Sequence, residues 1–342
     1  MVKKLFLKSL THVLTKLSPS RLKRLLIIIA KLLSIKGENF ITYVERPKRT
    51  NEIKVDPLGI TYENVSIVIQ GPVVFEEDFT YETVKLYFKT FPKVTIILST
   101  WDDLSGATAA DFEKLGVIVV LNKKPADYGT CNINLQLVST LNGLKMAQEA
   151  GKEFAVKTRT DQRLYNPFFL SSLKLLSQFP ITVSNKPTNS RLIVSSMSSL
   201  KYRPFGVTDM LMLGRTEDMI KYWDAPLDTR KVEFEHDITV KEYAKMEIAE
   251  TYILYSFLKR NNLDREFTLF DTWAAYANYF IILDKSSFNI FWFKYSIEKE
   301  NRLDFYEEHI YKEMTFFEWI DLKNVKHIPE LMIDKKMQSY NP

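Results

Sequence analysis

Short apolar strands alternate with helices along the first half of the chain, and this alternation limits the possible folds more than any other feature. The strand patterns are "VSIVIQ" (65–70), "VTIILST" (94–100), "VIVVLN" (117–122) and "EFAVKTR" (153–159). Helical patterns fill the gaps at 79–92, 107–116 and 132–150. Strands that alternate with helices form a parallel sheet with helices on both faces. We therefore predict an α/β, Rossmann-like fold.

The ends of these strands predict where a ligand binds. Parallel sheets bind ligands at the carboxyl ends of their strands. The four ends carry Gln70-Gly71-Pro72, Ser99-Thr100-Trp101-Asp102, Asn122 and Arg159-Thr160-Asp161. The glycine-rich phosphate loops G-x-G-x-x-G and G-x-x-x-x-G-K-[ST] do not occur in the chain. A diphosphate at this edge would thus be bound by side chains or by a metal ion.

The stretch "VKTRTDQRL" places a carboxylate among cations where the fourth predicted strand ends. Strand alternation puts Lys157, Arg159 and Asp161 on one side. Asp161 could hold a divalent cation that neutralises a nucleotide diphosphate, while the cations contact phosphate oxygens. The alternative is an ion pair of Asp161 with Arg159 or Arg163. We expect Arg163 to be structural.

The helix that begins near residue 132 opens with amide side chains, Asn132, Asn134 and Gln136. Amides and free backbone N–H groups at a helix N-terminus can bind a base, a ribose or a phosphate. The alternative is an asparagine that caps the helix, followed by exposed polar residues.

The second half of the chain is less regular. We predict a strand from Asp209 to Gly214, a helix capped by Thr216, and a helix over 245–260. Asp209 and Glu250 are the carboxylates that we consider for general-base catalysis on an acceptor hydroxyl, the alternative being solvated surface groups. The four histidines form no cluster, and we expect the one at 236 to be exposed. The single Cys131 cannot form an internal disulfide.

The positive charge of the chain is concentrated in its first fifty residues. The net charge is +5, but residues 1–50 carry twelve Lys or Arg against two Glu, so the remainder is acidic and is no nucleic-acid-binding surface. Leucine and isoleucine line one face of a predicted helix there, at positions Leu22, Leu25, Leu26, Ile29, Leu32 and Leu33. The apolar run is too short to span a bilayer. We predict an arm (1–45) that lies on an anionic membrane surface; the alternative is a helix packed on the protein's own body.

Six ordered motifs resemble the WavE-type lipopolysaccharide synthesis proteins, over roughly residues 62–285. They are "VSIVIQGPV", "FPKVTIILSTWDD", "NINLQLVSTLNGLKMA", "VKTRTDQRL", "FGVTDMLMLGRTEDMIKYW" and "AETYILYSFL". The resemblance implies a nucleotide-diphospho-sugar transferase fold of the GT-A kind. It marks, as donor-binding or catalytic positions, Gln70, Gly71, Thr100, Trp101, Asn132, Asn134, Gln136, Lys157, Arg159, Asp161, Asp209 and Glu250. Two departures stand out: Leu135 replaces a common arginine, and "TDQ" supplies one aspartate instead of an Asp-x-Asp pair.

The resemblance and the residues together predict one transferase domain (60–342), with a donor half at 60–165 and an acceptor half at 200–285. We expect it to move a sugar from a nucleotide-sugar donor to a lipopolysaccharide-core or lipid-linked acceptor, as a cytoplasmic protein held on the inner face of the membrane. Mn²⁺ or Mg²⁺ at Asp161 is a hypothesis that the missing second aspartate weakens. The alternatives are a transferase of another nucleotide-activated group, such as a polyol phosphate, and a non-catalytic scaffold of polysaccharide assembly.

Overall fold

The computed structural model describes residues 14–37, 43–55, 59–233, 237–263, 265–294 and 310–337. The chain separates into two compact units, Met1–Pro47 and Lys48–Pro342. The histidine at position 236 and parts of the basic arm (1–13 and 38–42) lie outside the described residues.

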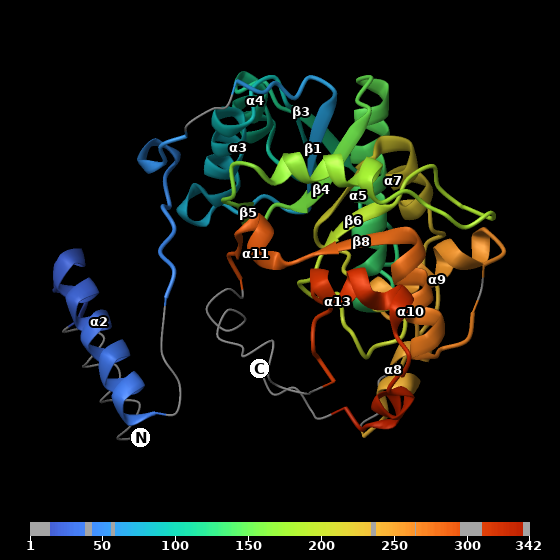
Figure 1. Ribbon diagram of the computed structural model, residues 1–342. Helices are drawn as coiled ribbons and strands as arrows, with labels where there is room; N and C mark the ends of the chain where they lie inside the picture. Colours follow the sequence, from blue (N-terminus) through green and yellow to red (C-terminus); the bar gives the residue numbers. More distant parts are fainter. Residues whose placement is uncertain are drawn as a thin grey trace. The chain divides into compact units, whose positions relative to one another are not determined.

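The larger unit is built on a seven-stranded sheet (Figure 1). Its strands are β1 (Val65–Gln70), β2 (Thr95–Trp101), β3 (Ile118–Asn122), β4 (Phe154–Arg159), β6 (Leu192–Ser195), β7 (Met212–Arg215) and β8 (Phe280–Leu283). The order across the sheet is β3-β2-β1-β4-β7-β6-β8. The predicted α/β class is confirmed, and the strands predicted in the first half lie within about one residue of their observed bounds.

The sheet is mixed, although the sequence predicts a parallel one. β1 pairs in parallel with β2 and β4, and β2 pairs in parallel with β3. β7 is antiparallel to both of its neighbours, β4 and β6. An antiparallel strand in an otherwise parallel sheet is common in large α/β folds, and the periodicity of a buried strand carries no information about its direction.

Helices cover both faces of the sheet. In the larger unit they are α3 (Phe79–Thr90), α4 (Gly106–Lys114), α5 (Ile133–Glu149), α6 (Leu175–Gln178), α7 (Thr216–Trp223), α8 (Val240–Lys245), α9 (Glu250–Arg260), α10 (Leu269–Tyr279), α11 (Lys285–Phe288) and α13 (Phe316–Asp321). Right-handed crossovers place α3 and α4 on one face and α5 on the other. α5 packs on β1 and β2 through Gly143, where an added Cβ would lie 2.4 Å from a methyl carbon of Val68.

Three boundaries in the second half differ from the prediction. Asp209 precedes β7 instead of lying on it, because the strand begins at Met212. Thr216 does not cap α7; its hydroxyl donates to the carbonyl of Lys152. The helix predicted over 245–260 begins at Glu250, since Ala249 before it has φ +49° and breaks the helical run.

Two short strands outside the main sheet matter for the site. β5 (Gln162–Leu164) pairs antiparallel with β9 (Ile290–Trp292), and Gln162 lies opposite Trp292. The backbone N–H of Phe293 also donates to the carbonyl of Asp161. This pairing brings a tryptophan from more than a hundred residues away beside the end of β4.

The smaller unit contains the helix α2 (Pro19–Lys36). Leu26, Ile29, Leu32 and Leu33 of the predicted apolar stripe are exposed, whereas Leu22 and Leu25 are partly covered. Ala30 is its only buried residue among those described. In the described part of the chain, no helix has the length and apolar character to span a membrane.

Candidate functional site

A pocket of about 500 Å³ lies at the carboxyl ends of β1, β2 and β4, where the sequence predicts the ligand. Among its lining residues are seven of the predicted site residues: Gln70, Gly71, Trp101, Asn132, Gln136, Arg159 and Asp161. The other five, which are Thr100, Asn134, Lys157, Asp209 and Glu250, do not line it. The edge of the sheet thus brings together most of the predicted donor residues, from four separate segments.

The floor of the pocket is formed where β1 ends. The side-chain carbonyl of Gln70 accepts a hydrogen bond from the buried hydroxyl of Ser139 on α5, at 2.8 Å. Gly71 has φ +114°, and a Cβ there would lie 3.0 Å from the hydroxyl oxygen of Thr160. Glycine is required at this position because the backbone is left-handed and β4 passes close by. Thr100 is buried below, and its carbonyl accepts from Asn122.

One wall is the loop that leads into α5, whose backbone is left-handed at Cys131 (φ +54°) and Asn132 (φ +62°). Asn134 does not face the pocket. Its amide donates to the carbonyls of Asp127 and Asp228, at 3.0 and 2.8 Å, and its own carbonyl accepts from the N–H of Asp228. Asn134 therefore ties this loop to the segment around residue 228, and Asn132 and Gln136 remain the amides that face the pocket.

The carboxylate of Asp228 completes this tie. Its side chain accepts from the N–H of Thr130 at 3.2 Å and from the guanidinium of Arg230 at 2.8 Å. Burial alone would raise the pKa of Asp228, but these hydrogen bonds outweigh it and hold the pKa at about 2. A charged anchor thus fixes the strained loop at the pocket wall.

Asp161 and Arg159 form a bidentate ion pair inside the pocket. Nε and Nη2 of Arg159 donate to the two carboxylate oxygens at 2.8 and 3.0 Å, and Nε1 of Trp292 donates to Oδ2 at 3.0 Å. Burial opposes the charge on Asp161, yet the hydrogen bonds from Arg159 and Trp292 keep its pKa below the usual value. The side chain of Arg159 is 27% exposed and that of Asp161 is 15% exposed, so the pair lies at the pocket surface.

Arg163, the other arginine near Asp161, is fully buried. Its guanidinium donates to the carbonyls of Lys48 and Phe79 at 2.8 and 2.9 Å, and to the hydroxyl of Thr83 at 2.9 Å. It also lies 4.4 Å from the centroid of the Phe79 ring. These contacts make Arg163 a structural residue, as predicted.

Lys157 is fully buried and faces the interior rather than the pocket. Its ammonium donates to the backbone carbonyl of Asp209 and lies 4.7 Å from the ring centroid of Trp223 on α7. Burial lowers the pKa of Lys157 to about 7, and the negative charge of Asp209 acts in the opposite direction. Lys157 supports the loop that carries Asp209.

The two candidate bases lie near each other behind the pocket wall. Burial raises the pKa of Glu250, the ion pair with Arg203 opposes this rise, and the charge of Asp209 adds to it. Glu250 is also close enough to Cys131, on the wall, to raise the pKa of its thiol, although burial is the larger cause. Asp209 is 8% exposed, and no side chain in the described part of the chain donates a hydrogen bond to its carboxylate.

Four lining residues were not predicted at the site from the sequence: Val74, Lys124, Tyr128 and Cys131. Pro72 and Thr160 were named as parts of the strand ends, and Leu135 as a departure from the family pattern. Lys124 could have been found, because it follows the end of β3 at the same edge of the sheet. It brings a second cation to the pocket, where it pairs with Asp103. Leu135 faces the same space.

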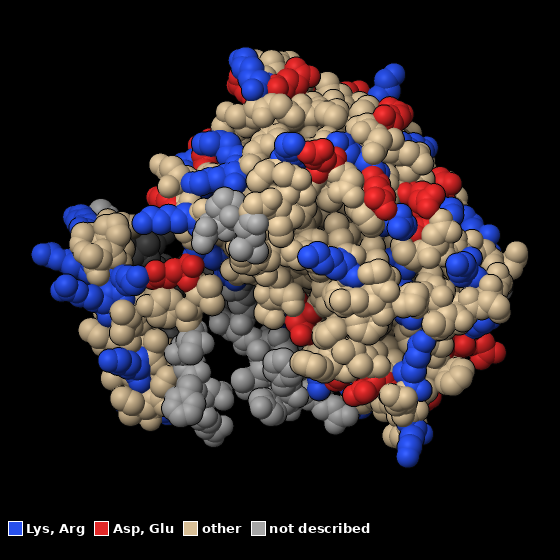
Figure 2. Space-filling model, turned by 45° about the horizontal axis from the view of Figure 1, so that its top comes forward, with Lys and Arg blue, Asp and Glu red and all other residues tan. Residues whose placement is uncertain are grey.

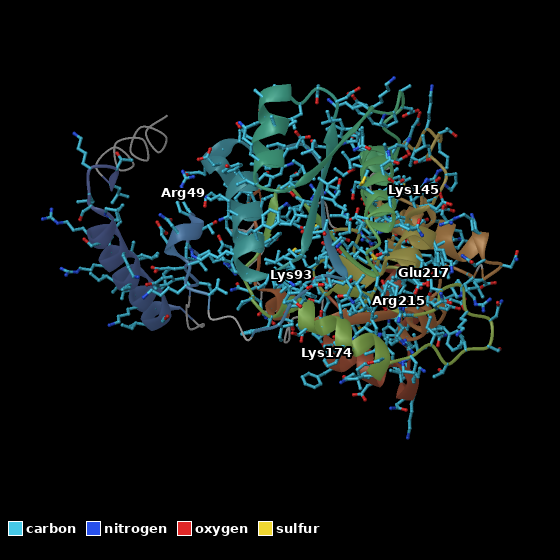
Figure 3. All side chains as sticks on the ribbon, turned by 90° about the horizontal axis from the view of Figure 1, so that it is seen from above. Arg49, Lys93, Lys145, Lys174, Arg215 and Glu217 are labelled. Carbon is cyan, nitrogen blue, oxygen red and sulfur yellow. The ribbon has the colours of Figure 1, made fainter. Side chains whose placement is uncertain are left out.

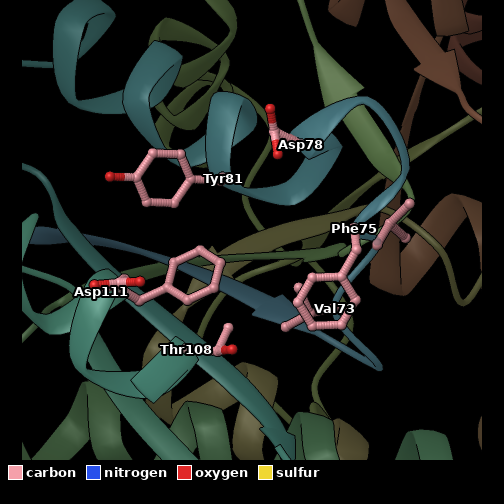
Figure 4. A pocket seen from close by; sticks show the side chains of 8 residues that line it. Val73, Phe75, Asp78, Tyr81, Thr108 and Asp111 are labelled. Atoms are coloured by element: carbon pink, nitrogen blue, oxygen red, sulfur yellow. The ribbon is translucent and has the colours of Figure 1, made fainter. Parts of the chain in front are cut away.

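A second cavity of about 320 Å³ adjoins the pocket through Val74, which lines both. It lies between the loop after β1 and the helices α3 and α4 (Figure 4). Tyr81 and Phe112 form its aromatic wall with rings 5.6 Å apart, and Asp78 and Asp111 lie at its rim. No sequence pattern predicted this cavity.

The pocket does not fit a divalent metal ion well. Mg²⁺ and Mn²⁺ prefer several oxygen ligands, usually including carboxylates. Asp161 is the only carboxylate among the lining residues, and its oxygens already accept three hydrogen bonds. Within the described ranges, no group of three or more His, Cys, Asp or Glu could hold a metal ion.

Charges on the surface of the larger unit are mixed. Figure 2 shows Lys and Arg intermingled with Asp and Glu over the face in view. Such mixing is typical of a solvated surface rather than of one that binds a polyanion.

The mixed sheet, with a polar pocket at the carboxyl ends of its strands, defines an α/β protein with a small-molecule-sized site. The chain belongs to the WavE lipopolysaccharide synthesis family, which matches residues 65–340. The family predicted from the sequence is therefore confirmed, and with it a place among the proteins of lipopolysaccharide synthesis. No curated protein matches the chain.

Solved structures of low similarity include three transferases. One is a glycosyltransferase involved in glycosylation of the major capsid of PBCV-1: 9% identity, 46% of this chain and 64% of that chain, TM-score 0.25. Another is glucosyl-3-phosphoglycerate synthase from Mycobacterium tuberculosis in complex with Mn²⁺, UDP and phosphoglyceric acid. It is 12% identical, the match covers 65% of this chain and 68% of that chain, and the TM-score is 0.31. The third is a cytidylyltransferase from Leptospira borgpetersenii serovar Hardjo-bovis (strain JB197). It is 10% identical, the match covers 80% of this chain and 99% of that chain, and the TM-score is 0.34. The first is matched over less than two thirds of its length. At these TM-scores the likeness says nothing about the substrates of this chain.

Proposed function

We propose that this protein transfers a sugar from a nucleotide-sugar donor to a lipopolysaccharide-core or lipid-linked acceptor. The observation that carries the proposal is the pocket, because it gathers polar side chains, two cations and the start of α5 at the edge where α/β folds bind ligands. Its 500 Å³ volume is within the range of small-molecule sites. Family membership supports a role in lipopolysaccharide synthesis.

In this proposal Arg159 and Lys124 contact the diphosphate of the donor. Asn132 and Gln136, at the beginning of α5, bind the ribose or the base, which Trp101 contacts through its ring. The side-chain carbonyl oxygen of Gln136 is buried and has no hydrogen-bond partner in the described structure, so a donor hydroxyl or amide would satisfy it.

The donor is tested by thermal-shift measurements against UDP-, GDP-, CMP- and dTDP-sugars. A ligand present at about 100 times its dissociation constant stabilises the folded protein by about 2.7 kcal/mol. We expect one nucleotide class to raise the melting temperature. A polyol-phosphate transferase would respond to the corresponding nucleotide-polyol instead. A scaffold protein would respond to none, and that result would reject the proposal.

We propose Asp209 as the general base that deprotonates the acceptor hydroxyl, with Glu250 as the alternative. Two observations favour Asp209: its carboxylate lacks a hydrogen-bond donor among the described residues, whereas Glu250 is paired with Arg203. The Asp209→Asn variant should lower turnover by about 100- to 10,000-fold while donor binding persists. Near-normal turnover in both Asp209→Asn and Glu250→Gln would reject both candidates.

We propose that the basic arm holds the enzyme on the cytoplasmic face of the membrane. Six large apolar side chains of α2 are exposed: Leu26, Ile28, Ile29, Leu32, Leu33 and Ile35. The arm is also strongly basic, and each Lys or Arg near an anionic membrane contributes on the order of 1 kcal/mol. A helix that combines exposed apolar residues with this charge suits the interface of an anionic bilayer.

Deletion of residues 1–40 tests this proposal. The truncated protein should no longer sediment with liposomes that contain anionic lipid, and its turnover of a soluble acceptor analogue should be retained. The full chain on neutral phosphatidylcholine liposomes is the control for charge. Equal sedimentation of the two proteins with anionic liposomes would contradict the proposal.

A further inference from the structure

The carboxylate of Asp161 is almost fully engaged by protein donors. Oδ1 accepts from Nε of Arg159, and Oδ2 accepts from both Nη2 of Arg159 and Nε1 of Trp292. A carboxylate offers about four lone-pair positions, so three are already occupied. A divalent cation could use the fourth only beside a guanidinium that repels it.

The elements around Asp161 hold this arrangement in place. Trp292 is buried, and the β5–β9 pairing fixes its backbone. The carbonyl of Asp161 is bound by the N–H of Phe293 at 2.9 Å. The guanidinium of Arg159 also lies 5.8 Å from the ring centroid of Trp292. Turning the carboxylate toward a metal ion would break a partly buried, charge-assisted pair.

The charged residues that line the rest of the pocket are mainly cations, which suit an anionic ligand and are not ligands for a metal ion. The charged lining residues are Lys124, Arg159 and Asp161. Arg159 pairs with Asp161 and Lys124 pairs with Asp103, so the two cations offer an anion N–H donors, whereas the lining offers a metal ion no carboxylate besides Asp161. Leu135 contributes no charge at its position on the wall.

We propose that the pocket binds the diphosphate of the donor through Arg159, which Asp161 and Trp292 orient, without a divalent cation that bridges Asp161 to the phosphates. This inference rests on the proposed function, since it concerns the donor of the same site. Asp161 is then a positioning residue, and Arg159 is the group that contacts the ligand.

The chemistry of arginine suits this role. A guanidinium is planar, always charged and carries five N–H donors, and it binds phosphate oxygens in a bidentate geometry. A fixed guanidinium also loses little side-chain entropy when the ligand arrives. An arginine that is already oriented can thus donate directed, charge-assisted hydrogen bonds to the phosphate oxygens.

The first experiment measures binding of UDP, GDP, CDP and dTDP by calorimetry, in EDTA and again in Mg²⁺ or Mn²⁺. We expect one of these nucleotides to bind with nearly the same affinity in each condition. The second titrates Mn²⁺ alone into the protein, followed by electron paramagnetic resonance. We expect no stoichiometric Mn²⁺ site.

The variants separate the two roles. Arg159→Gln should weaken binding of that nucleotide by about 10- to 100-fold, the loss typical of a charged hydrogen bond. Arg159→Lys keeps the charge but loses the bidentate geometry of the guanidinium, so its nucleotide affinity should lie between those of the wild type and Arg159→Gln. Asp161→Asn should also weaken nucleotide binding, and the loss in EDTA should equal the loss in Mn²⁺, because Asp161 acts by orienting Arg159 and not by binding a metal ion.

Arg215→Gln is the matched control. Arg215 also pairs with a carboxylate, that of Glu153 at 2.7 Å, but it lies opposite Phe154, at the start of β4, at the other end of the strands (Figure 3). This variant should bind the nucleotide as the wild type does. Circular dichroism melting of each variant establishes that it is folded.

Two results would overturn the inference. One is binding that disappears in EDTA and returns with Mn²⁺ in the wild type but not in Asp161→Asn. The other is one tightly bound Mn²⁺ per chain that Asp161→Asn removes. If no diphosphate binds with or without metal, the proposed function fails and this inference with it.

Discussion

The seven residues from Lys157 to Arg163 carry three cations, and the structure uses them in opposite ways. Arg159 lies at the pocket with Asp161, whereas Lys157 and Arg163 are fully buried. The sequence treats Lys157 and Arg159 alike, since both lie on the same side of one strand. What differs is coverage: the pairing of β4 with β7 ends at Lys157, opposite Met212, so Arg159 has no β7 neighbour. Position along the strand therefore separates a cation that lines the pocket from a buried, structural one.

The largest expected effect on stability comes from Arg163. Arg163→Leu removes the hydrogen bonds that the guanidinium donates to the carbonyls of Lys48 and Phe79 and to the hydroxyl of Thr83, so the free energy of unfolding should fall by about 3 kcal/mol. Urea unfolding measures this change. Arg215→Leu, on the surface, should lose no more than about 1 kcal/mol. If Arg163→Leu and Arg215→Leu were equally stable, the buried contacts of Arg163 would not stabilise the fold more than a surface ion pair does.

Lys157 should reveal its burial through pH. Its pKa is about 7 in the folded protein, whereas lysine in an unfolded chain titrates near 10.4. Between about pH 7 and 10.4 the unfolded chain binds more protons at this site, so the free energy of unfolding should rise with pH. The slope is up to about 1.4 kcal/mol per pH unit.

Lys157→Met provides the comparison for this slope. The difference between wild type and variant, measured by urea unfolding from pH 6 to 10, isolates Lys157 from other groups. The charged groups that face Lys157 are Asp209, Arg159 and Asp161. The variant keeps all three, so their contributions are present in both curves. If the free energy of unfolding changed with pH in the same way in both proteins, the ammonium of Lys157 would be solvated, and Lys157 would not differ from Arg159 in burial.

The smallest change in stability is expected at the pocket. Asp161→Asn should lower the free energy of unfolding by only about 1 kcal/mol, because the partly exposed Arg159 can be hydrated when it loses its partner. Turnover should nevertheless fall, because Arg159 loses the carboxylate that orients it. Activity assays and thermal melting of the same preparation test both statements. A large loss of stability with unaltered turnover would make the ion pair purely structural.

Much of the first half was predictable from the sequence. The bounds of β1 match the apolar run 65–70, and α3 fills the helical pattern that follows. Buried parallel strands are short runs of β-branched residues, and each is followed by a helix with a clear period, so local patterns suffice. Seven predicted donor residues meet in one pocket for the same reason, since the ends of parallel strands lie at one edge.

The second half was predicted less well because its contacts are long-range. Left-handed residues at Glu247 and Ala249 delay the start of α9, and the sequence shows no glycine there to indicate them. Asn134 has the pattern of a helix-terminus ligand, yet it binds the backbone of Asp228, more than ninety residues away. A pattern of nearby residues cannot record a partner at that distance.

The sequence by itself determined the α/β class, the edge of the sheet where the polar residues gather, the family and the basic composition of the first fifty residues, because each depends on local periodicity, composition or ordered motifs. Only the tertiary structure decided which polar residues reach the pocket. The antiparallel β7 covers Lys157, and the β5–β9 pairing places Trp292 against Asp161. Burial and hydrogen bonding are properties of what packs against a residue, and those neighbours come from distant parts of the chain.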